Sequence, residues 1–172
     1  GPIGGLCVAL ASEAGADEIV ITDLEDVPLE VAKKMGASQT INVSGSSDAM
    51  DAFSADKGYF DIAFECSAAQ AALRSCIASV RPQGTIMQIG VTGDLHIPIN
   101  QLVGKELSLM GTHRFHSEFA SAVQLIDSSI IDVAPMISYT YPLEQAVTAF
   151  EVAGDRSRTV KVQLSFQSED NQ

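Results

Sequence analysis

The chain has 172 residues, of which 46% are hydrophobic, and its mean hydropathy of +0.17 is that of a protein with a sizeable core. Its 22 acidic and 10 basic residues give a formal charge of -12, which disfavours nucleic acid and anionic membranes as partners. We expect a cytoplasmic protein without disulfides, because no apolar run approaches the ~18 residues of a membrane span, no signal-peptide pattern is present, and the three cysteines form no C-x-x-C pair.

The first residues predict a tight turn that opens a helix. Pro2 suits the first helical position, and apolar residues recur from there until Gly15 can end the helix. A strand pattern follows and ends on Asp23. Glycines, helix, strand and terminal acid form the later part of a G-x-G-x-x-G dinucleotide motif, in which Gly1 and Gly4 take the second and third glycine positions. Because the motif normally follows a strand, we expect a sheet whose first strand is missing from this chain.

Helix and strand patterns then alternate, with short glycine-bearing joints between them. This alternation is typical of βαβ units and predicts an α/β fold with a doubly wound parallel sheet of the Rossmann type. We expect a serine of the turn 44–47 to cap the next helix, residues 81–84 to form a turn, and the region around Gly93, Pro98 and Gly104 to be a loop. Helices are expected at 2–14, 28–35, around 50–53, and at 69–80, 117–128 and 143–153; strands are expected at 18–23, 39–43, 60–66, 85–90, 106–112, 136–141 and 159–166, before a disordered tail at 167–172.

Short segments spread over nearly the whole chain carry a family resemblance. They are GPIG at 1–4, ITDL at 21–24, AKKMGA at 32–37, FDIAFECS at 60–67, RPQGT at 81–85, IGV at 89–91 and LSLMG at 107–111. With these segments the chain resembles the cofactor half of zinc-dependent medium-chain alcohol and polyol dehydrogenases. GKELSL at 104–109, RF at 114–115, SEF at 117–119, YPL at 141–143, AGD at 153–155 and KVQL at 161–164 look closest to the L-idonate 5-dehydrogenase and sorbitol dehydrogenase subfamilies.

The resemblance implies NAD as the cofactor and residues 1–112 as its Rossmann domain. The backbone of Gly1, Pro2, Ile3 and Gly4 would hold the pyrophosphate, and Asp23 would hold the adenosine ribose. The residues implied beside the nicotinamide are Cys66, Ser67, Ile89, Gly90, Val91, Gly111 and Thr112.

Two positions depart from the family pattern. Ala68 stands where relatives commonly have glycine, which puts the shape of that loop in question. Val27 and Pro28 stand where many relatives place a basic residue after the ribose-binding acid, so electrostatic help for the adenosine end is reduced.

The family's zinc ligands lie in an N-terminal catalytic domain that this sequence does not contain. We therefore expect zinc in the intact enzyme but no metal site and no catalytic residue in this chain, with His113 and His116 facing solvent. Residues 113–166 would pack toward the missing domain. The chain is thus expected to be an inactive fragment of an NAD-dependent polyol dehydrogenase, joined into a homodimer or tetramer through the edge strand 106–112.

The substrate implied by the resemblance is a polyhydroxylated secondary alcohol such as L-idonate or sorbitol. Arg114 lies just after the predicted edge strand and would reach this substrate, although a bridge from Arg114 to Glu118 is an equal alternative. Asp23, followed by Glu25 and Asp26, predicts NAD rather than NADP, because a 2′-phosphate would meet like charge. Two other functions stay open: a zinc-free medium-chain reductase, and a nucleotide-binding module without dehydrogenase chemistry, such as a methyltransferase or a sensory domain.

Overall fold

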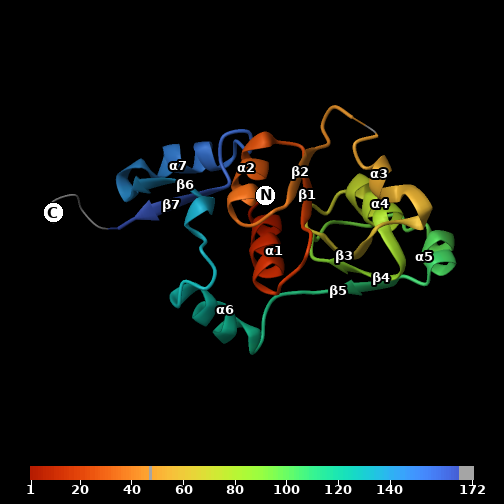
Figure 1. Cartoon of the computed structure of the whole chain (residues 1–172). Helices are drawn as coiled ribbons and strands as arrows, with labels where there is room; N and C mark the ends of the chain where they lie inside the picture. Colours follow the sequence, from red (N-terminus) through yellow and green to blue (C-terminus); the bar gives the residue numbers. More distant parts are fainter. Residues whose placement is uncertain (47, 167–172) are drawn as a thin grey trace. The chain divides into compact units, whose positions relative to one another are not determined.

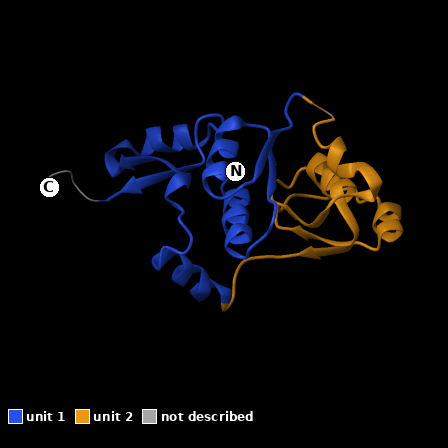
Figure 2. Ribbon diagram, viewed as in Figure 1, with its two compact units in different colours: residues 1–45, 118–172 blue, residues 46–117 orange. Residues whose placement is uncertain are grey.

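The computed structural model describes residues 1–46 and 48–166 (Figure 1), so the predicted disordered tail lies outside the described residues. The chain forms two compact units (Figure 2). Unit 1 contains residues 1–45 and the chain from residue 118 onward, and unit 2 contains residues 46–117. The functional boundary expected near residue 112 stays a prediction.

The first half of unit 1 follows the sequence prediction closely. Helix α1 (Pro2–Glu13) begins at the proline, β1 (Val20–Asp23) pairs in parallel with β2 (Gln39–Asn42), and α2 (Asp26–Lys34) connects the two strands. Helix α2 begins two residues before the predicted start at Pro28. Glu25 has the extended backbone of an N-cap, and the negative charge of Asp26 is favourable in the first turn of a helix.

The second half of unit 1 returns to pack on these first helices. It consists of α6 (Glu118–Asp127), the 3-10 turns η2 (Ala134–Met136) and η3 (Leu143–Gln145), β6 (Ile137–Pro142), α7 (Ala146–Ala153) and β7 (Lys161–Ser165). Strands β6 and β7 pair in parallel, and α7 connects them and lies against them (Figure 1). Ile131 and Met136 of this segment enter one core with Val8, Ala9, Ala32 and Met35 of α1 and α2.

Unit 2 is a three-stranded parallel sheet in the order β3-β4-β5. Its elements are α3 (Asp51–Ser54), η1 (Ala55–Lys57), β3 (Phe60–Glu65), α4 (Gln70–Ser79), β4 (Val80–Gln88), α5 (Ile99–Lys105) and β5 (Ser108–Gly111). The core is built from Leu73, Ile77, Val80, Ile86 and Leu102. Strand β5 lies at an edge, as expected for strand 106–112.

The described strand pairings confirm the parallel α/β fold. Among the described strands, β1 pairs only with β2, and β3 pairs with β4 but not with β1. Parallel neighbours joined by helices are the units of which a doubly wound sheet is built. No helix in the described part of the chain is long and apolar enough to cross a membrane.

Three local predictions were wrong. Met50, rather than a serine of the turn, is the N-cap of α3, and no side-chain cap is formed. Residues 81–84 lie within β4 as a bulge, because Phe60 pairs with Val80 whereas Ile62 pairs with Thr85. The region 99–105, expected to be a loop, is helix α5, in which Leu102 is buried in the core of unit 2.

The three cysteines, Cys7, Cys66 and Cys76, are each partly buried, whereas the sequence analysis favoured buried thiols. Burial, together with the nearby charge of Glu65, raises the pKa of the Cys76 thiol to about 12. Cys76 is therefore a protonated, packing side chain at neutral pH.

Candidate functional site

In unit 1 the predicted pyrophosphate turn and the predicted ribose acid meet. The N-terminal nitrogen of Gly1 donates to Asp23 Oδ2 at 2.6 Å, and the N–H groups of Leu24 and Glu25 donate to Asp23 Oδ1 at 2.8 and 3.3 Å. The Asp23 carboxylate thus stands at the end of β1, next to the N-terminus of α1. A helix N-terminus favours negative charge, and a carboxylate accepts hydrogen bonds from hydroxyl groups. This corner therefore suits a ligand in which an anionic group is linked to a group that carries hydroxyls.

The charge of Asp23 is stabilised by its surroundings. Burial raises the pKa of this carboxyl, but hydrogen bonds from the nitrogen of Gly1 and from the N–H groups of Glu25 and Leu24 outweigh burial and lower the pKa. The side chain is only 9% exposed. Asp23 is therefore ionised at neutral pH and available as a hydrogen-bond acceptor.

The glycines of the turn let helix α1 pass close to its neighbours. A Cβ on Gly4 would lie 3.5 Å from Ile21 Cδ1 of β1, and a Cβ on the buried Gly5 would lie 3.4 Å from Met35 Sδ. These are close contacts that a methyl group could still make. Close packing in this turn therefore involves Gly5 as well as Gly4, whereas Pro2 and Ile3 are exposed.

A cation that the sequence analysis did not consider reaches the same corner. Nη2 of Arg156 lies 3.7 Å from Asp23 Oδ1, and it would lie 3.4 Å from a Cβ on Gly1. Arg156 follows α7 and is separated from Asp23 by most of the chain. The sequence has no basic residue at Val27 or Pro28, where many relatives place one after the ribose-binding acid. In the structure, Arg156 provides a positive charge beside that acid.

In unit 2 the remaining predicted residues gather at the carboxyl ends of the sheet strands. Cys66 and Ser67 follow β3, Ile89, Gly90 and Val91 follow β4, and Gly111 and Thr112 lie at the end of β5. The N–H groups of Ile89 and Gly90 both donate to Glu65 O, at 2.8 and 2.9 Å, and the N–H of Thr112 donates to Gln88 O at 3.2 Å. Strand ends of this kind are where open parallel sheets bind ligands.

Glu65 organises this edge, and sequence reasoning did not single it out. Its side chain is 2% exposed and accepts hydrogen bonds from the N–H groups of Ser67 and Ala68, the Ser67 hydroxyl and Gln88 Nε2. Gln88 Nε2 also donates to Gly90 O at 2.9 Å, whereas Gln88 Oε1 is buried and has no hydrogen-bond partner among the described residues. The sequence did contain a signal for this role of Glu65, namely an acidic residue at the end of an apolar strand. A carboxylate buried there requires hydrogen-bond donors around it.

Gly90 and Ala68 bring the β3 and β4 loops into direct contact. A Cβ on Gly90 would lie 2.4 Å from Ala68 N and 2.9 Å from both Ala68 Cα and Glu65 Oε2. Ala68 itself has φ +60°, a left-handed conformation that favours glycine. The departure noted at Ala68 therefore leaves the loop in a glycine-type conformation, with a strained alanine in it.

The residues after β5 do not form a metal centre. Nε of Arg114 donates to His113 Nε2 at 3.1 Å, and both side chains are exposed. The alternative bridge between Arg114 and Glu118 is not among the ion pairs of the described residues. Within residues 1–46 and 48–166, no three histidine, cysteine or acidic side chains gather at metal-binding distance.

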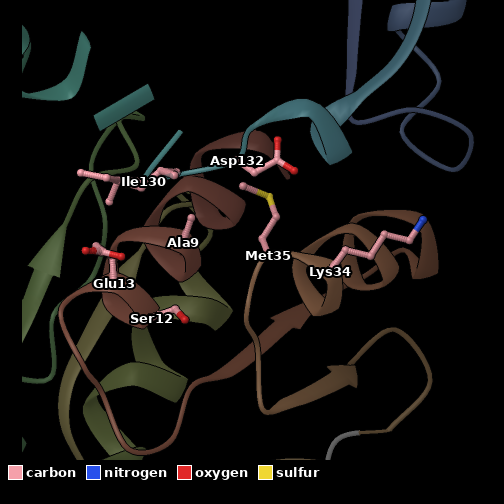
Figure 3. Close-up of a pocket in the computed structure, with 8 residues that line it drawn as sticks. Ala9, Ser12, Glu13, Lys34, Met35, Ile130 and Asp132 are labelled. Atoms are coloured by element: carbon pink, nitrogen blue, oxygen red, sulfur yellow. The ribbon is translucent and has the colours of Figure 1, made fainter. Parts of the chain in front are cut away.

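Unit 1 also contains a hollow of about 170 Å³ (Figure 3). It is lined from the C-terminal half of α1 by Ala9, Ser12 and Glu13, from α2 and its end by Lys34 and Met35, and by Ile130, Ile131 and Asp132. Because a helix of this length is roughly 18 Å long, this hollow is distant from the turn at Gly1. Its lining contains no group that the cofactor motif uses.

Comparison with known proteins gives consistent matches. A family model described as zinc-binding dehydrogenase matches residues 2–128. L-Idonate 5-dehydrogenase (NAD(P)(+)) of Escherichia coli strain K12 is 39% identical over 167 residues, which are 96% of this chain and 48% of that protein. Sorbitol dehydrogenase of Bacillus subtilis strain 168 is 35% identical over 158 residues, which are 89% of this chain and 44% of that protein.

The fold agrees with these matches. The crystal structure of L-idonate 5-dehydrogenase from Escherichia coli matches with a TM-score of 0.90 and 38% identity, over 96% of this chain and 48% of that chain. The present chain thus spans about half the length of the relatives it matches.

Proposed function

The chain belongs to the zinc-binding dehydrogenase family, and from this membership we propose that it is the NAD(H)-binding portion of an oxidoreductase acting on a polyol or sugar acid. The reaction is hydride transfer between a secondary alcohol and the nicotinamide. The observation that carries the proposal is the corner of unit 1, where the Asp23 carboxylate lies beside the N-terminus of α1. The identity to relatives named idonate and sorbitol dehydrogenases supports the substrate class.

Each unit has a defined part in this proposal. In unit 1, backbone groups of Gly1 to Gly4 bind the pyrophosphate and Asp23 accepts hydrogen bonds from the adenosine ribose. In unit 2, the loops held by Glu65 line the nicotinamide with Cys66, Ser67, Ile89, Gly90, Val91, Gly111 and Thr112. These residues bind and orient the cofactor, and none acts as an acid or base.

NAD is the preferred cofactor in this proposal. A 2′-phosphate would meet the charge of Asp23, with Glu25 and Asp26 close by in the chain. The Escherichia coli relative carries both NAD and NADP in its name, so the adenosine end of such a protein can also accept NADP.

The described residues contain no group of three or more side chains that could bind zinc. They offer no set of ligands for this metal, so no step proposed here passes through it. The chain on its own is therefore proposed to be inactive in alcohol oxidation, with zinc bound elsewhere in the intact enzyme.

Exposed apolar side chains in unit 1 suggest where the rest of the enzyme packs. Phe119, Val123 and Ile126 lie exposed on α6, and Val147 and Phe150 of α7 are each 75% exposed. Such clusters on a monomer mark interaction surfaces. We propose that this part of residues 113–166 contacts the catalytic domain of the full-length protein.

Arg114→Ala tests the substrate assignment in the full-length enzyme. Arg114 is exposed, has φ +60° and, among residues 1–46 and 48–166, donates a side-chain hydrogen bond to the neighbouring imidazole of His113, so its guanidinium can turn toward a polyhydroxylated or carboxylate-bearing substrate. We expect kcat/KM for L-idonate or sorbitol to fall about tenfold or more, the loss of one or two charge-assisted hydrogen bonds. The same variant should leave oxidation of a simple alcohol unchanged.

The control for this measurement is Arg74→Ala, which removes the same charge from the exposed side of α4. Higher wild-type kcat/KM on ethanol than on any polyol would refute the substrate class. Equal losses on polyol and simple alcohol in Arg114→Ala would show that Arg114 has no substrate role.

We also propose that the intact protein forms at least a dimer through β5. This strand is an edge of the unit 2 sheet, and Met110 on it is 52% exposed. A lysine on an edge strand opposes edge-to-edge pairing, so Met110→Lys should shift the mass measured by light scattering from dimer or tetramer toward monomer. Val103→Lys on the exposed side of α5 should leave it unchanged, and a monomeric wild type would contradict the proposal.

A further inference from the structure

Arg156 is a second recognition element of the corner formed by Gly1 and Asp23. Among the described residues, Arg156 is the one basic side chain that forms an ion pair with Asp23. The side chain is 64% exposed, whereas that of Asp23 is 9% exposed. The positive group therefore lies on the solvent side of the acid, where a bound nucleotide would arrive.

The turn that carries Arg156 is held in place by its neighbours. Asp155 Oδ1 accepts from Ser157 N at 3.1 Å and from the Ser157 hydroxyl at 2.6 Å, and Asp155 O accepts from the N–H groups of Arg158 and Thr159, each at 3.1 Å. Thr159 is buried, and its hydroxyl donates to carbonyl groups of this turn and of α7. These hydrogen bonds hold the backbone around Arg156, while its side chain is exposed.

We propose that Arg156 binds the 2′-phosphate of NADP and so determines how strongly the protein discriminates between NADP and NAD. This inference rests on the proposed function, because it assigns a residue to the adenosine end of that cofactor site. It adds a residue that the motif does not contain and that lies far from the motif in sequence.

The chemistry of the corner fits this role. In NADP the phosphate takes the place of the 2′-hydroxyl, one of the two ribose hydroxyls that would donate to Asp23, so it would come within reach of a cation 3.7 Å from the carboxylate. The planar guanidinium can donate two hydrogen bonds to one phosphate. The ion pair is long, at 3.7 Å, and its arginine is 64% exposed, so Arg156 can leave Asp23 for a phosphate at small cost.

The test is titration of the full-length protein with NADH and NADPH by calorimetry, using wild type, Arg156→Ala, Arg156→Lys and Lys34→Ala. Lys34 carries the same charge in the same unit but belongs to the hollow of Figure 3, near the other end of α1. Arg156→Ala should raise Kd for NADPH about ten- to a hundredfold, the loss of charge-assisted hydrogen bonds, and Kd for NADH by less than about threefold. Arg156→Lys should recover part of the NADPH affinity, and Lys34→Ala should change neither.

Several results would overturn the inference while leaving the proposed function intact. One is a wild type that binds NADH but not NADPH, and another is an unchanged Kd for NADPH in Arg156→Ala. A third is an equal loss of affinity for both cofactors in Arg156→Ala, which would mean that Arg156 binds the pyrophosphate or stabilises the fold. Wild type that binds neither cofactor would refute the proposed function as well.

Discussion

Asp23→Asn in the full-length protein is expected to raise Kd for NADH about ten- to a hundredfold. Asparagine keeps the shape of the side chain and can still accept from Leu24 N and Glu25 N, but it lacks the charge that strengthens hydrogen bonds from the two ribose hydroxyls. Kd for NADPH should fall, because a like charge no longer faces the 2′-phosphate. Fluorescence titration with both reduced cofactors measures the two constants.

Glu25→Gln is the matched control for Asp23→Asn. It removes the same charge two residues away, at the N-cap of α2, and it should change Kd for NADH by less than about threefold, because the Glu25 side chain makes no hydrogen bond at this cap. Thermal unfolding of both variants separates loss of binding from loss of fold. An unchanged Kd for NADH in Asp23→Asn would remove Asp23 from the ribose role.

Gly90→Ala is expected to lower the free energy of unfolding by about 1–3 kcal/mol or more, the usual cost of forcing extra atoms into a packed site. The added methyl would collide with the backbone of Ala68 at 2.4 Å, and a backbone atom cannot turn aside as a side chain can. The β3 and β4 loops would separate, so NADH binding should weaken at least about tenfold with the loss of their geometry. Urea unfolding and NADH titration of the full-length protein measure the two effects.

Gly93→Ala is the control for Gly90→Ala, because a Cβ on Gly93 meets no atom within 4 Å. Its stability and NADH affinity should stay within experimental error of the wild type. In the opposite direction, Ala68→Gly should stabilise the protein, since φ +60° costs an alanine roughly 1 kcal/mol that glycine avoids. A Gly90→Ala variant as stable and as tightly binding as the wild type would show that the two loops need not touch.

The sequence alone determined the elements whose signals are local. Pro2 after Gly1, the apolar spacing of the first helix, and Asp23 at the end of a strand pattern lie within one continuous stretch, and the structure reproduces each of them. The alternation of helices and strands likewise determined the parallel sheets, because a helical crossover is what joins parallel neighbours. Local errors arose where packing overrode a local signal, as when burial of Leu102 made a helix of residues 99–105 despite Gly104.

Only the tertiary structure decided which distant residues meet. Glu65 and Gln88 belong to different strands, and only the register of β3 against β4 brings Gln88 Nε2 to the buried carboxylate. Arg156 reaches Asp23 because the chain returns after α7 and packs on the first helices, a contact that no spacing in the sequence encodes. Periodicity reports which face of an element is buried, whereas contacts between remote segments depend on the summed packing of the whole core.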